Sequence, residues 1–334
     1  MSRSAATLTH IARSAEVSPS TVSKVLNGRS GVSAETRARV EQALRTHGYS
    51  PPAERHRQPF IELVFERVES VFAIEIIRGV QRAAVARGLS LVLSETGNRH
   101  TPGPEWLDQV LRRRPAGVVL VFSDLPTSAK ERLALRGIPF VVLDPAGDPA
   151  PDVPSVGSAN WSGGVQAARH LIELGHRSIA VIGGPNDMMC SRARVSGFRA
   201  ALDEAGVPFR EDALRWGNFA REDGLAFGRE LLQLPDRPTA VFAGNDLMAL
   251  GVLEAARMLG LSVPRDVSVV GYDDLEIAHW SGPPLTTVRQ PLAEMGEQAA
   301  LLALDAQDGA LRAARVDLAT SLVVRESTAP PPRA

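Results

Sequence analysis

The chain has 334 residues and a mass of 35.7 kDa, which is too long for one small core and predicts two or three domains. Its single cysteine, Cys190, excludes an intramolecular disulfide and fits a reducing cytoplasm, and no apolar run reaches membrane-spanning length. The net charge of −1 hides an asymmetry, because residues 1–58 hold nine Lys and Arg against four acids, which predicts a phosphate-binding module on an acidic body.

Two short helices joined by a tight turn are predicted at the amino end. Thr7 can cap a helix over 8–15, and Ser18 and Pro19 suit the cap and first turn of a second helix that runs to Asn27. A third helix follows, capped by Ser33. This is the helix-turn-helix arrangement, which lays its second helix in the major groove of DNA.

The second helix has an apolar stripe of Val22, Val25 and Leu26. Its opposite face carries short hydroxyls, one lysine and one amide: Ser20, Thr21, Ser23, Lys24 and Asn27. A helix facing only water usually carries Glu, Lys and Arg instead. Because hydroxyls and amides reach phosphate oxygens and lysine can reach guanine, this face is suited to duplex DNA.

From residue 60 onward, short apolar runs alternate with helical stretches. Runs rich in Val, Ile and Leu are typical of strands buried on both faces of a parallel sheet, and their alternation with helices predicts a doubly wound α/β architecture. The expected strands cover 61–65, 89–95, 116–122, 139–144, 178–184, 239–244 and 267–274. The expected helices cover 74–87, 106–113, 129–136, 163–174, 192–205, 224–232 and 246–259. The segments 151–164 and 283–292 are predicted to cross between two such sheets.

Polar side chains follow several of these strands. Asp144, Asn245 and Asp273 stand at or just past strand ends, and Arg194 begins a helix. Ligands of parallel sheets bind beyond the carboxyl ends of the strands, where carboxylates, an amide and a guanidinium can share the hydroxyls of a sugar. An ion pair between two lobes is the alternative role for Arg194 and Asp273.

Motifs for catalysis and for metal binding are missing from the sequence. It has no HExxH, no GxxxxGK[ST], no GxSxG and no clustered Cys and His, and the seven histidines are scattered without metal spacing. We therefore expect neither an enzyme nor a protein with a metal or a cofactor.

Residues 7–52 resemble the DNA-binding head of the lactose-repressor (LacI/GalR) family of bacterial transcription regulators. The matching motifs are TVSKVLNG (21–28), VSAETRARV (32–40) and GYSP (48–51). The resemblance implies that Pro19, Ser20 and Lys24 face bases. It also implies phosphate contacts by Ser18, Thr21, Ser23, Asn27 and Thr36, and Thr7, Arg55 and Arg57 complete the expected DNA-binding set.

Two departures from the family pattern concern the turn and the linker. Glu16 stands where the family usually has glycine, which places an acid near DNA and strains or reshapes the turn. The linker, 51–59, lacks the leucine that relatives wedge into the minor groove. Arg55, His56 and Arg57 could enter that groove electrostatically, and a solvated basic linker is the alternative.

The body resembles the effector domain of the same family. The matching motifs are ELGHRSIAVIGGP (173–185), SRARVSGFRAAL (191–202), VFAGNDLMALGVLEAARMLGLSVPRDVSVVGYDDL (241–275) and PPLTTVRQPLAEMG (283–296). The resemblance implies a head over 1–50, a linker, a two-lobed periplasmic-binding-protein-like domain over 60–328 and a disordered tail over 329–334. Lobe crossovers are expected near 155–163, 284–291 and 317–322. The expected effector contacts are Phe72, Asp144, Trp161, Arg194, Phe219, Asn245, Asp273 and Trp280; ordinary packing is the alternative for the aromatic residues.

The expected function is that of a sequence-specific transcriptional regulator. We expect a repressor that binds a pseudo-palindromic operator as a homodimer, in the bacterial cytoplasm, under the control of a small effector such as a sugar. No heptad pattern follows Glu326, which favours a dimer over a tetramer. A cytoplasmic sugar-binding protein that acts without DNA, and a ligand-dependent activator or co-repressor, are the alternatives.

Overall fold

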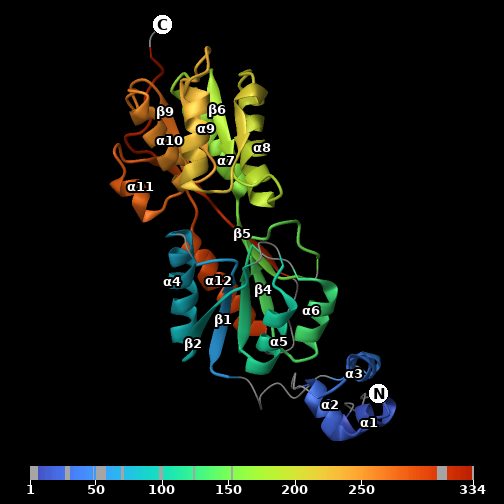
Figure 1. Ribbon diagram of the computed structural model, residues 1–334. Helices are drawn as coiled ribbons and strands as arrows, with labels where there is room; N and C mark the ends of the chain where they lie inside the picture. The colour runs from blue at the N-terminus through green and yellow to red at the C-terminus, as the bar shows by residue number, and fades with distance from the viewer. Residues whose placement is uncertain are drawn as a thin grey trace.

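The computed structural model describes residues 7–26, 31–47, 49, 58–68, 71–97, 101–122, 125–151, 153–306 and 314–332. The chain forms a small helical head and two α/β lobes (Figure 1). Asn27, Arg55 and Arg57 of the expected DNA-binding set lie outside the described residues. No helix in the described part of the chain has both the length and the apolar character needed to cross a bilayer.

The head consists of α1 (Leu8–Ser14), α2 (Pro19–Leu26) and α3 (Ala34–Thr46). Its core holds the predicted apolar stripe of α2 together with Ile11, Val40 and Leu44. Three predicted caps are confirmed: the hydroxyls of Thr7, Ser18 and Ser33 accept from the N–H groups of His10 at 3.3 Å, Thr21 at 3.1 Å and Thr36 at 3.2 Å, respectively. These bonds satisfy amide groups that have no partner inside a helix.

The turn between α1 and α2 contains Glu16 in the left-handed region, with φ of 53°. Glycine adopts this conformation freely, whereas a residue with a Cβ atom pays roughly 1–2 kcal/mol for it. The chain therefore keeps the turn geometry that a glycine would allow, at a cost in strain.

The first lobe, the N-lobe, is built on a parallel sheet in the order β11-β5-β4-β3-β1-β2. Helices α4 (Val71–Ala86) and α12 (Leu292–Asp305) cover one face, and α5 (Pro104–Arg113) and α6 (Thr127–Ala134) cover the other. The strands are β1 (Phe60–Phe65), β2 (Ser90–Glu95), β3 (Gly117–Val121), β4 (Phe140–Leu143), β5 (Ser155–Ser158) and β11 (Arg315–Leu318).

The second lobe, the C-lobe, repeats this plan in the order β12-β10-β9-β8-β6-β7, with β12 antiparallel. Helices α7 (Asn160–Glu173) and α8 (Met189–Glu204) cover one face, and α9 (Arg221–Leu232) and α10 (Asp246–Met258) cover the other. The strands are β6 (Ile179–Gly183), β7 (Leu214–Trp216), β8 (Ala240–Ala243), β9 (Ser268–Asp273), β10 (Thr286–Arg289) and β12 (Ser321–Val323). A short helix, α11 (Glu276–Trp280), and a 3-10 turn at Glu211–Ala213 complete the lobe.

The chain passes between the lobes three times, from β5 to α7, from β10 to α12 and from β11 to β12. The strands β5, β7, β10, β11 and β12 and the helices α11 and α12 were not predicted as separate elements. Strands of three or four residues are too short to show a hydrophobic period. The tail expected over 329–334 is anchored at its start, because the Ala329 N–H donates to the Ser268 hydroxyl at 3.0 Å.

Paired helices approach each other through glycine. A Cβ atom on Gly164 of α7 would overlap the Arg194 carbonyl of α8, and one on Gly197 of α8 would overlap the Trp161 carbonyl of α7. The two backbones are therefore in direct contact. The same reciprocal arrangement occurs in α4–α12 through Gly79 and Gly296 and in α9–α10 through Gly224 and Gly251.

Candidate functional site

The outer face of α2 is open to solvent. Ser18, Pro19, Ser20 and Lys24 are exposed, while the apolar stripe on the other side is buried in the head core. The Ser18 hydroxyl lies 2.7 Å from that of Ser20 and 2.9 Å from that of Thr21. Hydroxyls clustered at a helix N-terminus, with a lysine one turn on, form a surface that suits phosphate oxygens and base edges.

The head holds four other described members of the expected DNA-binding set. Thr21 and Ser23 are half-buried on α2, and Thr36 stands at the start of α3, where its hydroxyl accepts from the Ser33 hydroxyl at 2.8 Å. Thr7 is exposed at the start of α1. The head thus presents polar groups from the starts of three helices.

Between the lobes, Arg194 of α8 is the centre of a buried polar network. Its Nη1 donates to the Gly244 carbonyl at 2.6 Å, and its Nε donates to Oδ1 of Asn160 at 2.8 Å. The guanidinium also lies 3.7 Å from Oδ1 of Asp273 and 3.8 Å from the centre of the Tyr272 ring. Arg194 and Asp273 both belong to the C-lobe, so their ion pair does not join the two lobes as the alternative interpretation expected.

Links from this network to the N-lobe run through a chain of hydrogen bonds. Gln290, just after β10, donates from Nε2 to Oδ1 of Asp273 at 2.6 Å. The Ser158 hydroxyl, at the end of β5, donates in turn to Oε1 of Gln290. A change at Asp273 can therefore reach the N-lobe through two side chains.

The network contains two carboxylates whose charge is costly. Burial raises the pKa of Asp273 to about 7, and burial raises the pKa of Asp144 to about 6; in both cases the charge of Arg194 opposes the shift. Both residues have positive φ, 112° for Asp273 and 48° for Asp144, and Oδ2 of Asp144 is buried without a hydrogen-bond partner. Strained backbone and unpaired polar atoms of this kind gather at ligand sites.

Asn245 and Phe219 contact each other on the C-lobe side. Asn245 caps α10, accepting from the Met248 N–H at 2.9 Å, and its amide donates to the Phe219 carbonyl at 3.0 Å. The Phe219 ring lies 5.8 Å from the Arg194 guanidinium. Phe72, in the N-lobe, stacks on Phe122 at 5.2 Å. Thus Asn245 already has protein partners for both ends of its amide.

A cavity of about 320 Å³ lies beside the network, with walls from both lobes. The N-lobe contributes Asp144 and the β5 and β11 strands, and the C-lobe contributes the starts of α7 and α8. Trp161, which is 50% exposed, is part of the wall, whereas Trp280, which is 72% exposed, is not. Wall residues not named from the sequence include Asn160, Cys190, Arg315 and Asp317.

One residue of the network that was not named from the sequence had a usable signal there. Gln290 directly follows β10, so the rule that selected Asp144 and Asp273 would also have selected it once β10 was recognised. The segments in or beside the lobe crossings contain Asn160, Arg315 and Asp317. These segments show no hydrophobic periodicity, so the sequence did not indicate that they line a cavity. Among the described residues, no group of His, Cys, Asp and Glu side chains could hold a metal ion.

Comparison with known proteins agrees with both parts of this architecture. Residues 7–52 match the model of bacterial regulatory proteins of the lacI family, and residues 168–328 match that of the periplasmic binding protein-like domain. The HTH-type transcriptional repressor PurR of Escherichia coli O139:H28 is 36% identical over 306 residues, covering 90% of each chain.

Two solved structures resemble nearly the whole chain. The complex of the transcriptional regulator CelR with cellobiose has a TM-score of 0.73 and 36% identity, and covers 96% of this chain and 99% of that one. The lac repressor dimer bound to operator and the anti-inducer ONPF has a TM-score of 0.70 and 29% identity, with coverage of 98% and 100%.

Proposed function

The chain belongs to the lacI family of bacterial regulatory proteins. From that membership we propose that it is a repressor that binds a pseudo-palindromic operator as a homodimer. A sugar then lowers or raises its affinity for the operator. The proposal includes no catalytic step.

DNA recognition is assigned to the outer face of α2. Its exposed Lys24 and hydroxyls stand on a helix whose inner face is fixed in a core, so that they keep their positions when the helix enters a groove. We assign base contacts to Pro19, Ser20 and Lys24. Phosphate contacts are assigned to Ser18, Thr21, Ser23 and Thr36.

The effector is assigned to the space between the lobes, and the observation that carries this assignment is the cavity of about 320 Å³ beside the Arg194 network. Its volume is at the lower end of the range for small-molecule sites. The wall combines carboxylates, an arginine and serines with the face of Trp161, and such a set suits the hydroxyls and the apolar face of a sugar. CelR, which shares the fold, was solved with cellobiose.

Homodimerisation is assigned to the side of the molecule that carries α4, β2 and α11, the left side in Figure 1. The strand β2 is an edge strand, paired only with β1. Ile74 and Val85 of α4, Leu93 of β2 and Trp280 of α11 are large, exposed apolar side chains. Exposed apolar groups on neighbouring elements mark interaction surfaces, and the position of Trp280 fits this role better than that of a ligand contact.

Fluorescence anisotropy of a labelled operator fragment, with and without mono- and disaccharides, tests the proposal. We expect at least one sugar to change operator affinity, and the direction of the change distinguishes induction from co-repression. Asp317→Asn should alter the response to that sugar while operator affinity without sugar stays the same. Unchanged affinity with every sugar would favour a regulator that acts without a sugar.

A further inference from the structure

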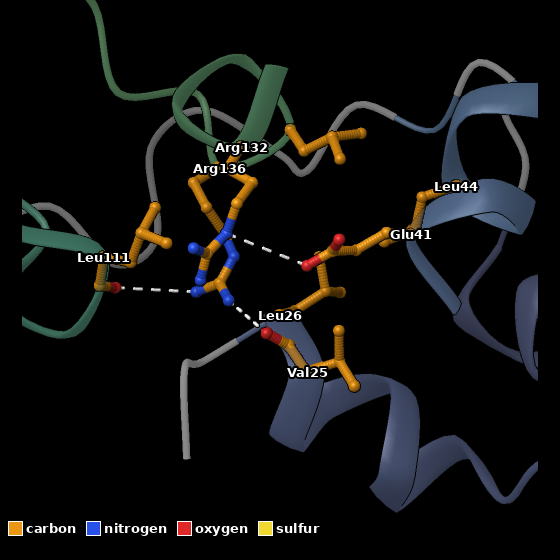
Figure 2. Close-up of a pocket in the computed structure, with 8 residues that line it drawn as sticks. Val25, Leu26, Glu41, Leu44, Leu111, Arg132 and Arg136 are labelled. Atoms are coloured by element: carbon orange, nitrogen blue, oxygen red, sulfur yellow. Dashed lines mark hydrogen bonds and ion pairs between the residues drawn. The ribbon is translucent and has the colours of Figure 1, made fainter. Parts of the chain in front are cut away.

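We propose that the surface of α5 and α6 that faces the head in Figure 1 is a docking site for the head of the same chain. In a dimer, this contact would fix the positions of both heads before they bind one operator. The proposal rests on the proposed binding of an operator by a homodimer. Figure 2 shows the contact, with the Arg136 side chain reaching from the N-lobe toward the head.

Arg136, just after α6, joins the ends of two helices. Its Nη2 donates to the carbonyl of Val25 in the last turn of α2, and its Nη1 donates to the carbonyl of Leu111 in α5 at 3.5 Å (Figure 2). The last carbonyls of a helix have no partner inside it and carry partial negative charge, so a guanidinium is a favourable partner for both. One side chain thus connects the head to the lobe through backbone atoms.

Side chains around Arg136 extend the contact. Arg45 of α3 pairs with Glu131 of α6 at 3.2 Å, and Arg132 of α6 lies 3.8 Å from Glu41 of α3. Leu135 packs against the apolar core of the head. The cavity left between the two surfaces is only about 10 Å³, roughly the space of one water molecule.

The burial and hydrogen bonding of Arg136 indicate a specific contact between the head and the N-lobe. Exposed ion pairs contribute little on their own. Arg136, however, is half-buried, and this burial lowers its pKa to about 9, which leaves the cation charged at neutral pH. A half-buried cation that donates to two helix ends requires a fixed geometry.

Docking and DNA contact use different parts of the head. The docked surface consists of the last turn of α2 and one side of α3, whereas the exposed Ser18, Pro19, Ser20 and Lys24 lie toward the first turns of α2. The docked head can therefore still face DNA. A head held in place loses less freedom when it binds, so that a dimer with two docked heads engages both half-sites at a lower entropic cost.

A linker insertion combined with Arg136→Ala tests this. Nine Gly and Ser residues are inserted between Ala53 and Glu54 in the full-length wild-type chain, in Arg136→Ala and in Arg112→Ala, a control that removes an exposed arginine from α5. Operator affinity is measured for each. If docking sets the head position, the insertion leaves wild-type and Arg112→Ala affinity unchanged. In Arg136→Ala, where docking no longer sets the head position, doubling the length of the connection weakens affinity about threefold for each head, or roughly tenfold for two.

Limited proteolysis between head and body provides a readout that needs no DNA, so it separates failure of docking from failure of operator binding. We expect faster cleavage in Arg136→Ala and Glu131→Arg than in Arg112→Ala, and recovery when Glu131→Arg is combined with Arg45→Glu. Equal cleavage rates, or an insertion effect that is the same in all backgrounds, would overturn the proposal. Tighter operator binding by Arg136→Ala would also overturn it, because docking would then keep the heads off DNA.

Discussion

The head and the interlobe network use charge in opposite ways. On α2, Lys24 and its neighbouring hydroxyls are exposed and stand on a small apolar core. Between the lobes, Arg194, Asp144 and Asp273 are almost completely buried and are held by one another and by backbone groups. Exposed charge can be changed without harm to the fold and is screened by salt, whereas buried charge is part of the stability of the protein.

Removing the central cation should have the largest effect. Arg194→Ala leaves buried carboxylates without their counter-charge, and breaking such a pair costs about 3–5 kcal/mol. We expect urea unfolding at lower concentration and loss of the ligand response, with operator affinity retained by the protein that remains folded. Arg192→Ala, an exposed arginine of the same helix, is the control. Equal stability of the two variants would show that the network is not coupled to folding.

On the head, Lys24→Ala should weaken operator binding by about 1–3 kcal/mol and relax the preference at one base pair. The unfolding midpoint should stay the same, because the side chain is exposed. Competition binding against a set of single-base operator variants measures the preference, with Arg39→Ala as a control for loss of charge. An equal loss of affinity for all operator variants would show that Lys24 contacts a phosphate and not a base.

The next largest effect should be a pH dependence of the free energy of unfolding that comes from the interlobe network and not from the head. With pKa values of about 7 for Asp273 and about 6 for Asp144, the folded protein holds protons that an unfolded carboxyl, near 3.8, has released. Stability from these groups is therefore present below about pH 4 and is lost as the pH rises toward 7, by up to about 1.4 kcal/mol per pH unit for each group. Urea unfolding at pH 5, 6 and 7 should give a shallower dependence for Asp273→Asn. The same slope in both proteins would contradict the assignment.

The smallest expected effect concerns a cap of the head. Ser33→Ala removes the hydroxyl that accepts from the Thr36 N–H and should lower the stability of the head by about 1 kcal/mol. Ser33→Gly should cost only a few tenths of a kcal/mol, since glycine is tolerated at this position. Hydrogen exchange of α3 amides measures the local change, and the ligand response should stay as in the wild type. An equal effect of the two substitutions would argue against a capping role.

The difference between the head and the interlobe network also explains which features could be predicted from the sequence. The head was predictable because caps, such as Thr7 and Ser33, and the apolar stripe of the eight-residue helix α2 are local signals. Asp144, Asn245 and Asp273 were selected because they stand at or just past the ends of buried strands, a pattern that also holds in the structure. Their roles as effector contacts stay predictions.

Other parts of the site depend on contacts between distant segments. Ser158, Asn160, Gln290 and Asp317 meet only after the chain has crossed between the lobes, and the strands around them have three or four residues. The second role of Asn245, as a helix cap, did have a local signal, since an asparagine directly precedes an apolar helix. The docking contact of Arg136 has none, because its acceptors are backbone carbonyls.

The glycine contacts between α7 and α8 have a consequence for how a bound molecule would be sensed. Because Gly164 and Gly197 place the two backbones directly against each other, we expect α7 and α8 to move as one unit that carries the hydrogen-bonded Asn160 and Arg194. Asp144 lies on the other lobe, outside this pair of helices. We expect that lobes closing around an effector would rotate as rigid bodies about the three chain crossings. A small displacement near Asn160 and Arg194 would then become a larger displacement at the far end of the N-lobe.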